Sequence, residues 1–273
     1  MDTIVFYHHN CPDGFSAAWV VWRKLKDKAT YKWLDYHAPF NYDFRGKTLY
    51  FLDVVPDKTD FLRLLKQNRV IVIDHHISSE QMIKKAADYS FSLDHCAAVL
   101  AWHYFFPQKR LPRLLKYVED LDLWRFRQSY SKEINAAISV VDFDFKQWDK
   151  LARRLETAKG RREYIKEGKL IMAYKNKMIE KISSRARPVM FAGQEALMVN
   201  SSVLVSEIGN ALVQRHASVA IIWFESKNKR KISLRSDGTV DVAKLAEKYK
   251  GGGHRAAAGF VLDIKKPLPW KNL

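Results

Sequence analysis

The chain has 273 residues, which is long enough for one large domain or two medium ones. It carries 47 Lys and Arg residues against 30 Asp and Glu residues, and this net charge of +17 favours a polyanionic partner such as nucleic acid or a nucleotide. No window approaches about 18 uninterrupted apolar residues, which excludes a membrane-spanning helix. The two cysteines cannot form a disulfide framework, so we expect a reducing, cytoplasmic location.

Strand-like and helix-like segments alternate along the first part of the chain, and we expect its first residues to form a strand rather than a signal peptide. The β-branched run at 70–73 is typical of a buried parallel strand. The alternation predicts an α/β domain with a doubly wound, mostly parallel sheet over residues 1–140. The expected strands are 3–8, 30–36, 48–54 and 69–73, and the expected helices are one beginning near Ser16, 57–67, 94–106 with Asp94 as its cap, and 111–122.

The remaining residues divide into two parts. Residues 141–187 are strongly charged and helical in character, and we interpret them as a helical linker. Residues 188–273 mix strand-like and helix-like segments, which predicts a second, smaller α/β domain. The expected elements there are strands 196–199, 219–224 and 231–235, a basic hairpin tip at 225–230, a helix at 241–249 and a final strand.

Carboxylates and histidines follow three of the predicted strands at their carboxyl ends. His9 and Asp13 come after the first strand, Asp53 closes the strand at 48–54, and Asp74-His75-His76 closes the strand at 69–73. Neighbouring parallel strands place their ends ~5 Å apart. Because ligands bind at this edge of an open α/β sheet, we expect these side chains to converge on a site.

The residue types of this group predict a metal centre. Carboxylates and imidazoles without a cysteine quartet suit Mn²⁺, Mg²⁺, Fe²⁺ or Zn²⁺ rather than a closed structural zinc site. There are enough ligands for two ions, bridged most simply by Asp53, and either Asp120 or Asp122 can join from the helix at 111–122. Two ions ~3.5–4 Å apart can activate water for in-line displacement at phosphorus. A histidine outside the ligand set could protonate the leaving oxygen or hold a phosphate oxygen.

Two of these motifs carry a resemblance to a known family. Asp74-His75-His76 after its strand resembles the signature of the DHH phosphoesterase superfamily. The segment 251–259, Gly-Gly-Gly-His-Arg-Ala-Ala-Ala-Gly, resembles the signature of the accompanying DHHA1 domain. Residues 9–14, the strand ending at Asp53 and the helix at 117–124 match the superfamily's other motifs in order and rough spacing. The resemblance covers essentially the whole chain and implies a nucleotide phosphodiesterase or exonuclease.

The resemblance also implies a role for each motif residue. The implied metal ligands are His9, Asp13, Asp53, His75 and Asp120, with Asp53 bridging two ions, most simply Mn²⁺, and with Asp122 as the alternative to Asp120. His76 would face the substrate phosphate, and Asp74 would ligate a metal or orient the histidines, so both are catalytic candidates. The implied substrate-binding residues are Arg235, Ser236, Gly252, Gly253 and His254. Glycines fit this role because their backbone N–H groups can approach an anion closely.

The first motif departs from the family pattern at one position. Related motifs often have two acids, whereas Cys11 occupies the first acidic position here. A thiolate ligand would favour Zn²⁺ or Fe²⁺ over Mn²⁺. Alternatively, Cys11 is a small buried residue, and one metal is bound weakly or His8 compensates.

The aromatic residues fall into two groups. Trp19, Trp22, Trp102 and Trp124 occur at helical spacing among apolar residues, which predicts positions in the core. The sequence does not place Trp33, Tyr36 and Phe40. An aromatic side chain near the site could stack on a base, which contributes ~1–3 kcal/mol.

Together these patterns predict a metal-dependent phosphodiesterase with its site in the cleft between two domains. The expected reaction is attack by metal-bound hydroxide on a short single-stranded oligonucleotide, which releases nucleoside monophosphates. Two alternatives stay open, namely a cyclic-dinucleotide phosphodiesterase and a non-catalytic nucleotide or nucleic-acid binder with a weakened metal site. No membrane partner is expected, and an oligomer is compatible with the sequence.

Overall fold

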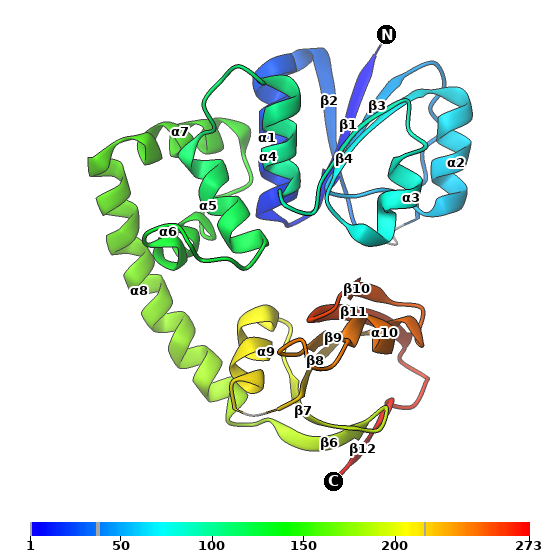
Figure 1. Cartoon of the computed structure of the whole chain (residues 1–273), viewed down its shortest axis with the longest axis vertical. Helices are drawn as coiled ribbons and strands as arrows, with labels where there is room; N and C mark the ends of the chain where they lie inside the picture. Colours follow the sequence, from blue (N-terminus) through cyan, green and yellow to red (C-terminus); the bar gives the residue numbers. More distant parts are fainter. Residues whose placement is uncertain (1, 37–38, 216) are drawn as a thin grey trace. The chain divides into compact units, whose positions relative to one another are not determined.

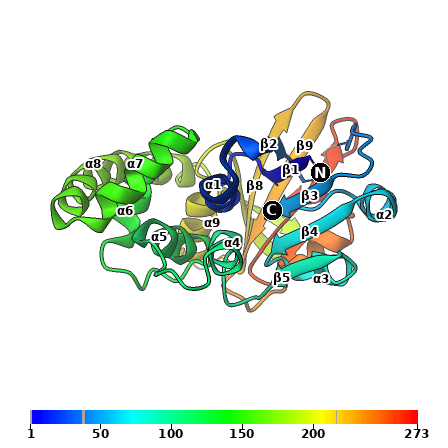
Figure 2. The same cartoon turned by 90° about the horizontal axis from the view of Figure 1, so that it is seen from above.

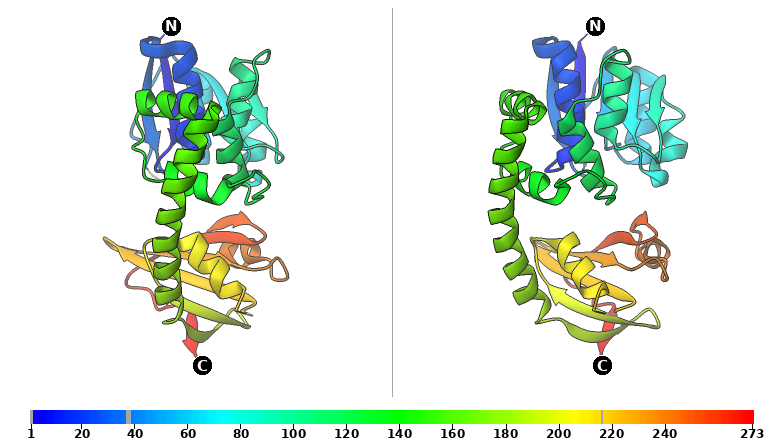
Figure 3. Two further views of the ribbon diagram at one scale, coloured as in Figure 1. Left: turned by 90° about the vertical axis from the view of Figure 1, so that its left-hand side faces the viewer. Right: turned by 60° about the vertical axis from the view of Figure 1, so that its left-hand side comes forward.

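The computed structural model describes residues 2–36, 39–215 and 217–273, and the chain divides into two compact units (Figure 1). The first unit ends at Met172, and the second unit is Ala173–Leu273. This division falls within one helix, α8 (Ala158–Ser183), which Figure 3 shows as continuous. Over the described residues, no helix has both the length and the apolar character needed to cross a bilayer.

A five-stranded sheet forms the centre of the first unit. All of its neighbouring strands are parallel, and the order β2-β1-β3-β4-β5 places β1 beside β3. The chain therefore winds in one direction from β1 and in the other direction from β3, which confirms the doubly wound prediction. The strands are β1 (Thr3–His8), β2 (Ala29–Leu34), β3 (Thr48–Leu52), β4 (Arg69–Asp74) and β5 (Asp88–Phe91).

Helices cover both faces of this sheet, because successive apolar side chains of its strands point to opposite sides. In β1, Ile4 and Phe6 belong to one core, whereas Val5 belongs to the other. Figure 2 shows α1 and α4 over one face and α2 and α3 over the other. These elements are α1 (Pro12–Leu25), α2 (Lys58–Gln67), α3 (Glu80–Ile83) and α4 (Ala97–Phe105), with 3-10 turns η1 (Lys26–Lys28) and η2 (Ile77–Ser79).

The helices that follow α4 extend the core on the α1 side. They are α5 (Arg113–Asp122), α6 (Ser131–Ile138), α7 (Phe145–Glu156) and α8. Trp148 of α7 is fully buried, and its indole N–H donates a hydrogen bond to Ser16 Oγ of α1 over 3.0 Å. A Cβ built on Gly168 of α8 would lie 1.8 Å from the carbonyl oxygen of Glu133. The backbones of α6 and α8 are therefore in direct contact.

The second unit contains a mixed sheet in the order β10-β11-β9-β8-β7-β6-β12, in which only the β7–β8 pair is parallel among the described strands. In β8, Ile221 belongs to the core that α10 covers, and Ile222 belongs to the core that α9 covers. This arrangement confirms the smaller α/β domain. The elements are β6 (Arg187–Phe191), β7 (Gln194–Asn200), α9 (Val205–Val213), β8 (Val219–Ser226), β9 (Lys229–Arg235), α10 (Val242–Glu247), β10 (Gly252–His254), β11 (Ala257–Asp263) and β12 (Trp270–Asn272).

Two predicted helix starts are wrong. Helix α1 begins at Pro12 rather than near Ser16, because proline fits the first helical turn. Asp94 does not cap α4, because the cap position is Cys96 and no local side chain accepts from the first N–H groups. The sequence also did not predict β5, β6, α6 or α9, whose short segments carry little periodic signal.

We predict that Gly168→Ala lowers the free energy of unfolding by about 1–3 kcal/mol, because the added methyl group forces α8 away from α6. Lys166→Ala is the matched control, since it introduces the same residue at an exposed position of the same helix. Urea denaturation of both variants tests this expectation. Equal stability of Gly168→Ala and wild type would show that the two helices are not in close contact.

Candidate metal centre

The carboxyl ends of β1, β3 and β4 bring titratable side chains together where the winding of the sheet reverses. Candidate ligand atoms form three overlapping groups, and the atoms of each group all lie within 4.8 Å of one another. We refer to these residues as the cluster. The groups are Asp53 with Asp74, His75 and His76, then His8 with Cys11 and Asp53, then Asp13 with His75 and Asp122.

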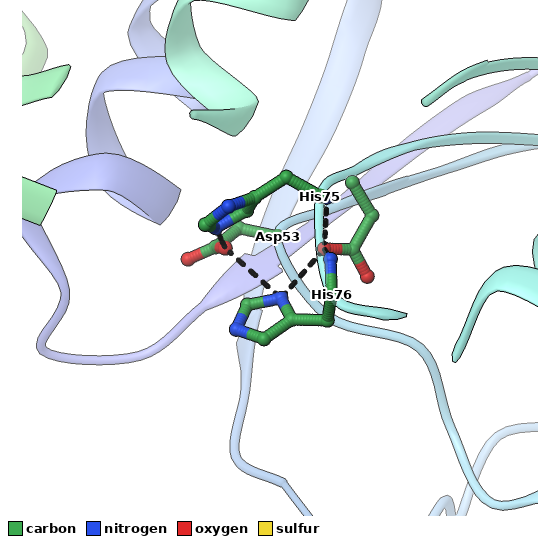
Figure 4. Close-up of side chains that lie close together, drawn as sticks. Asp53, His75 and His76 are labelled. Atoms are coloured by element: carbon green, nitrogen blue, oxygen red, sulfur yellow. Dashed lines mark hydrogen bonds and ion pairs between the residues drawn. The ribbon is translucent and has the colours of Figure 1, made fainter. Parts of the chain in front are cut away.

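Asp53 lies at the centre of the cluster and is buried. Its Oδ2 atom is 3.2 Å from His8 Nδ1, and its Oδ1 atom is 3.4 Å from His75 Nε2 and 3.7 Å from His76 Nδ1. Figure 4 shows the carboxylate between the two imidazole rings. Burial opposes ionisation, but hydrogen bonds from His75 and His8 hold the pKa of Asp53 below its usual range.

The backbone of Asp53 is held in an uncommon conformation. Its φ of +60° lies in the left-handed region, which is unfavourable for a residue with a side chain. The Asp53 N–H donates to the Ile73 carbonyl over 3.0 Å, and its own carbonyl accepts from the Tyr36 hydroxyl over 2.7 Å. The Tyr36 ring also packs edge-on against His8 and His76. Tyr36 is thus a positioning residue, a role that no periodic signal in the sequence reveals.

Asp74 fixes the turn that follows β4. Its Oδ1 atom accepts hydrogen bonds from the N–H groups of His75 and His76 over 2.6 and 3.1 Å, and it lies 2.7 Å from His76 Nδ1. Burial lowers the pKa of His76, but this hydrogen bond and the charges of Asp74 and Asp53 raise it to about 8. Of the two roles proposed for Asp74, the Oδ1 contacts support orientation of the histidines.

Three carboxylates lie close to one imidazole nitrogen of His75. Its Nε2 atom is 3.4 Å from Asp53 Oδ1, 3.5 Å from Asp122 Oδ2 and 3.8 Å from Asp13 Oδ2. Burial opposes protonation, but the Asp53 hydrogen bond and the charges of Asp13 and Asp122 raise the pKa of His75 to about 10. Burial and the Asp53 charge raise the pKa of Asp122 to about 6. One imidazole proton cannot satisfy three carboxylates, so the site favours additional positive charge.

Asp13 connects the cluster to the beginning of α4. Its carboxylate oxygens accept hydrogen bonds from the N–H groups of Ala97 and Ala98, both over 2.8 Å. These N–H groups have no partner within the helix, and the helix dipole favours a negative charge at this end. Burial and the neighbouring charges of Asp53 and Asp122 nevertheless raise the pKa of Asp13. Asp13 therefore caps α4 from a distant part of the sequence.

Gly14 and Cys11 complete the first motif. A Cβ on Gly14 would lie 2.8 Å from the His8 carbonyl oxygen, so glycine is required where α1 starts beside the end of β1. The Cys11 Sγ atom belongs to the group with His8 and Asp53. Burial, followed by the charge of Asp53, raises the pKa of the Cys11 thiol, which favours its neutral form.

His9 does not join the cluster, whereas His8 does. His9 Nδ1 is 3.2 Å from Asp35 Oδ1, and the His9 ring stacks on Trp33 with a centroid separation of 4.2 Å. Its N–H donates to the Leu34 carbonyl over 3.0 Å at the point where β1 ends and the chain turns. Of the two histidines, His8 therefore faces Asp53 and His9 faces Asp35 and Trp33.

Of the two acids in α5, the structure brings Asp122 to the cluster rather than Asp120. The carboxylate of Asp120 is buried and accepts hydrogen bonds from the N–H groups of Arg127 and Gln128 over 2.8 and 3.0 Å. Asp122 instead faces His75. Asp120 thus holds the loop after α5, and Asp122 is the acid of α5 that lies close to His75.

Two atoms of the cluster support a metal-binding role. Asp74 Oδ2 is buried and has no hydrogen-bond partner among the described residues, and the buried Asp53 Oδ1 lies 3.4 and 3.7 Å from nitrogens of His75 and His76. A buried carboxylate oxygen without a partner is unfavourable unless a cation binds it. Carboxylate and imidazole donors suit divalent ions such as Mn²⁺, Mg²⁺, Fe²⁺ and Zn²⁺. The cluster therefore fits a divalent metal.

In the second unit, the register of three strands aligns two of the predicted substrate-binding residues. Arg235 of β9 pairs with Ala257 of β11, and Ala257 pairs with His254 of β10. The Arg235 guanidinium donates to Ser206 Oγ of α9 over 2.8 Å, and its burial lowers its pKa. Arg235 and His254 therefore lie in one row across the sheet.

The other three predicted substrate-binding residues, Ser236, Gly253 and Gly252, differ in their local contacts. The Ser236 hydroxyl donates to the Val240 carbonyl over 2.7 Å and accepts from the Gly238 N–H over 3.2 Å, so it closes a turn. Gly253 has a φ of +142° and lies against the backbone of β11, which requires glycine. No described atom lies within 4 Å of a Cβ built on Gly252. The space beside Gly252 can therefore admit a ligand.

Comparisons with known proteins agree with this geometry. The DHHA1 domain family matches residues 189–267. The solved DHH domain of a protein described as belonging to a family of ribosomal proteins has the same fold, with a TM-score of 0.58, 14% identity, and coverage of 96% of this chain and 82% of that chain. Residues 189–267 therefore resemble the DHHA1 domain family, and the chain shares its fold with a solved DHH domain.

Two curated relatives have sequence similarity to this chain. Protein R106 of Acanthamoeba polyphaga mimivirus is 28% identical in an alignment 300 positions long that covers 99% of this chain and 70% of that protein. A 3',5'-cyclic-nucleotide phosphodiesterase of Helicobacter pylori is 22% identical over 259 residues, which cover 77% of this chain and 73% of that protein.

We predict that Asp120→Asn and Asp122→Asn change the free energy of unfolding in different ways. Asp120→Asn should lower the free energy of unfolding by about 1–3 kcal/mol, because it weakens two buried hydrogen bonds to backbone N–H groups. Asp122→Asn should preserve or raise the stability of the metal-free protein, because it removes a carboxylate that burial and Asp53 disfavour.

Thermal unfolding and Mn²⁺ titration calorimetry measure these effects. Asp122→Asn should weaken Mn²⁺ binding by at least about tenfold, as expected when a metal site loses a carboxylate. Asp120→Asn should change Mn²⁺ binding less than Asp122→Asn does. A larger loss of Mn²⁺ affinity in Asp120→Asn than in Asp122→Asn would favour Asp120 as the ligand.

Proposed function

We propose that this protein is a metal-dependent phosphodiesterase that hydrolyses short single-stranded oligonucleotides to nucleoside monophosphates. The observation that carries the proposal is the convergence of buried Asp13, buried Asp53 and partly exposed Asp122 on one nitrogen of His75. Such a site concentrates negative charge that a divalent cation would neutralise. The resemblance to the DHH/DHHA1 superfamily and the name of the Helicobacter pylori relative support phosphodiester chemistry.

We assign the metal ligands from the cluster. Asp53 would be shared by two ions, because one of its oxygens faces His8 and the other faces His75. The other proposed ligands are His8, Asp13, His75 and Asp122, with His8 replacing His9 and Asp122 replacing Asp120. Divalent ions at such a site supply Lewis-acid activation of water and neutralisation of phosphate charge.

His76 and Asp74 would act on the phosphate. Asp74 Oδ1 holds His76 Nδ1 at 2.7 Å, and the Tyr36 ring packs against the imidazole, so the orientation of His76 is restricted. Its pKa of about 8 keeps a large fraction protonated near neutral pH. His76 can therefore hold a phosphate oxygen or donate a proton to the leaving oxygen.

The second unit would hold a substrate phosphate. The open space at Gly252 gives an anion access to backbone N–H groups, and Gly253 makes the required backbone conformation accessible. Arg235 and His254 lie in the adjacent row of the sheet. Ser236 contributes by closing the turn beside Arg235 rather than through a free hydroxyl.

We predict that hydrolysis of short RNA or DNA requires a divalent metal and Asp74. EDTA should abolish turnover, and Mn²⁺ should restore it. Asp74→Ala should lower kcat/KM by about 10–100-fold, because Asp74 orients His76 through a hydrogen bond in the surroundings of the metal. Asp27→Asn, which changes a carboxylate in the exposed turn η1, should leave kcat/KM unchanged.

A screen of short RNA, short DNA, phosphoadenosine phosphate and cyclic dinucleotides with Mn²⁺, Mg²⁺, Zn²⁺ and Fe²⁺ provides the measurement. Equal rates for wild type and Asp74→Ala on every substrate would sink the enzymatic proposal. Binding without turnover would favour the non-catalytic binder, with a metal site weakened at Cys11.

We predict that salt separates the proposed substrate from the cyclic-dinucleotide alternative. Each phosphate contact on a single strand contributes a slope of about −0.7 to log K against log salt. A tetranucleotide that uses the net charge of +17 should therefore lose affinity more steeply with salt than a compact dinucleotide. Tighter binding and faster hydrolysis of the cyclic dinucleotide, with shallow slopes for both ligands, would favour the alternative.

A further inference from the structure

Trp124 lies exposed beside the cluster, contrary to its predicted place in the core. Its exposed fraction is 44%, whereas Trp19 and Trp102 are buried as predicted. Trp124 follows Asp122 by two residues, and Asp122 Oδ2 is 3.5 Å from His75 Nε2. A large exposed aromatic side chain thus follows, two residues along the chain, an acid that faces His75.

The loop that carries Trp124 is held by a single residue, Asp120. The Asp120 carbonyl accepts from the N–H groups of Arg125 and Phe126 over 2.9 and 3.3 Å. Its carboxylate accepts from the next two N–H groups, those of Arg127 and Gln128. Four consecutive N–H groups therefore converge on one residue, which restricts the path of the loop.

These hydrogen bonds maintain an unfavourable backbone conformation in the loop. Trp124 and Phe126 have φ values of 53° and 51°, a region that bulky side chains rarely adopt. The ring of Phe126 contacts the indole edge-on at a centroid distance of 4.9 Å, and Lys132 Nζ lies 5.0 Å from the Phe126 ring centroid. Strained residues that the surrounding structure over-determines are typical of functional sites. The indole is thus held in a defined position while much of its surface stays exposed.

A second exposed tryptophan, Trp33, offers a comparison. It is 54% exposed, but its ring already stacks on His9, and it lies on the edge strand β2. The residue that Trp33 contacts is outside the cluster, whereas Trp124 belongs to the segment that supplies Asp122. Trp124 is therefore the better placed of the two for a group attached to the reacting phosphate.

We propose that Trp124 stacks on a nucleobase of the substrate. The inference rests on the proposed function, because a nucleotide at the cluster places a base within reach of the neighbouring loop. An indole provides a large aromatic face that stacks on any base without reading its identity. The expected specificity is for substrates that carry a base on the nucleoside next to the reacting phosphate.

Equilibrium binding in EDTA tests the proposal independently of turnover. Fluorescence anisotropy would compare a labelled diadenosine dinucleotide with the same molecule lacking both bases. The variants are Trp124→Ala, Trp124→Phe and the control Tyr174→Ala, which removes an aromatic ring that is 68% exposed on α8. Circular dichroism would verify that each variant is folded.

Trp124→Ala should weaken dinucleotide binding by about 5- to 150-fold, as expected for the loss of one stacked base. Its affinity for the abasic ligand should equal that of wild type, Trp124→Phe should retain most of the affinity, and Tyr174→Ala should retain all of it. An equal loss for both ligands, or no loss, overturns the role of Trp124. Equal binding of the two ligands by wild type, including no binding of either, overturns base stacking itself.

Hydrolysis with Mn²⁺ separates this inference from the proposed function. Base-dependent binding through Trp124 without any hydrolysis supports stacking and contradicts the phosphodiesterase proposal. Hydrolysis with no difference between wild type and Trp124→Ala in KM supports the phosphodiesterase and contradicts stacking. A larger effect of Trp33→Ala than of Trp124→Ala on dinucleotide affinity also overturns the assignment to Trp124.

Discussion

Repulsion among Asp13, Asp53 and Asp122 around one nitrogen of His75 is the constraint on which the site depends. Asp13 and Asp53 are buried, and such an arrangement is unfavourable there unless other contacts impose it. The Asp53 backbone is held by Ile73 and Tyr36, and Asp13 is held by two N–H groups of α4. The surrounding fold thus maintains a concentration of negative charge that a divalent cation would relieve.

The contacts that hold the site residues in place also stabilise the surrounding helices and loop. Helix α4 has no local side-chain cap, so its first N–H groups depend on Asp13, which is also a proposed metal ligand. Asp120 satisfies four N–H groups of the loop after α5 and thereby restricts the path of the loop that carries Trp124. Asp13 and Asp120 therefore both stabilise local structure next to the cluster.

Much of the site could be predicted because it follows from the ends of parallel strands. The alternation of strands and helices predicted a doubly wound sheet, and Asp53 and His75 lie where the strands β3 and β4 end. The β1–β3 neighbourhood then brings Asp13 to the same edge. Short segments such as β5 and α6 could not be predicted, because few residues with a mixed pattern carry no clear period.

The sequence by itself determined the fold class and the residue types at the strand ends, because hydrophobic periodicity and motif order are local properties. Only the tertiary structure decided between adjacent candidates. His8 faces Asp53, whereas His9 faces Trp33. Hydrogen bonds to the following loop engaged Asp120 and left Asp122 facing His75. Both outcomes depend on contacts between segments that are distant in the sequence. The local pattern of residues along one segment does not contain this information.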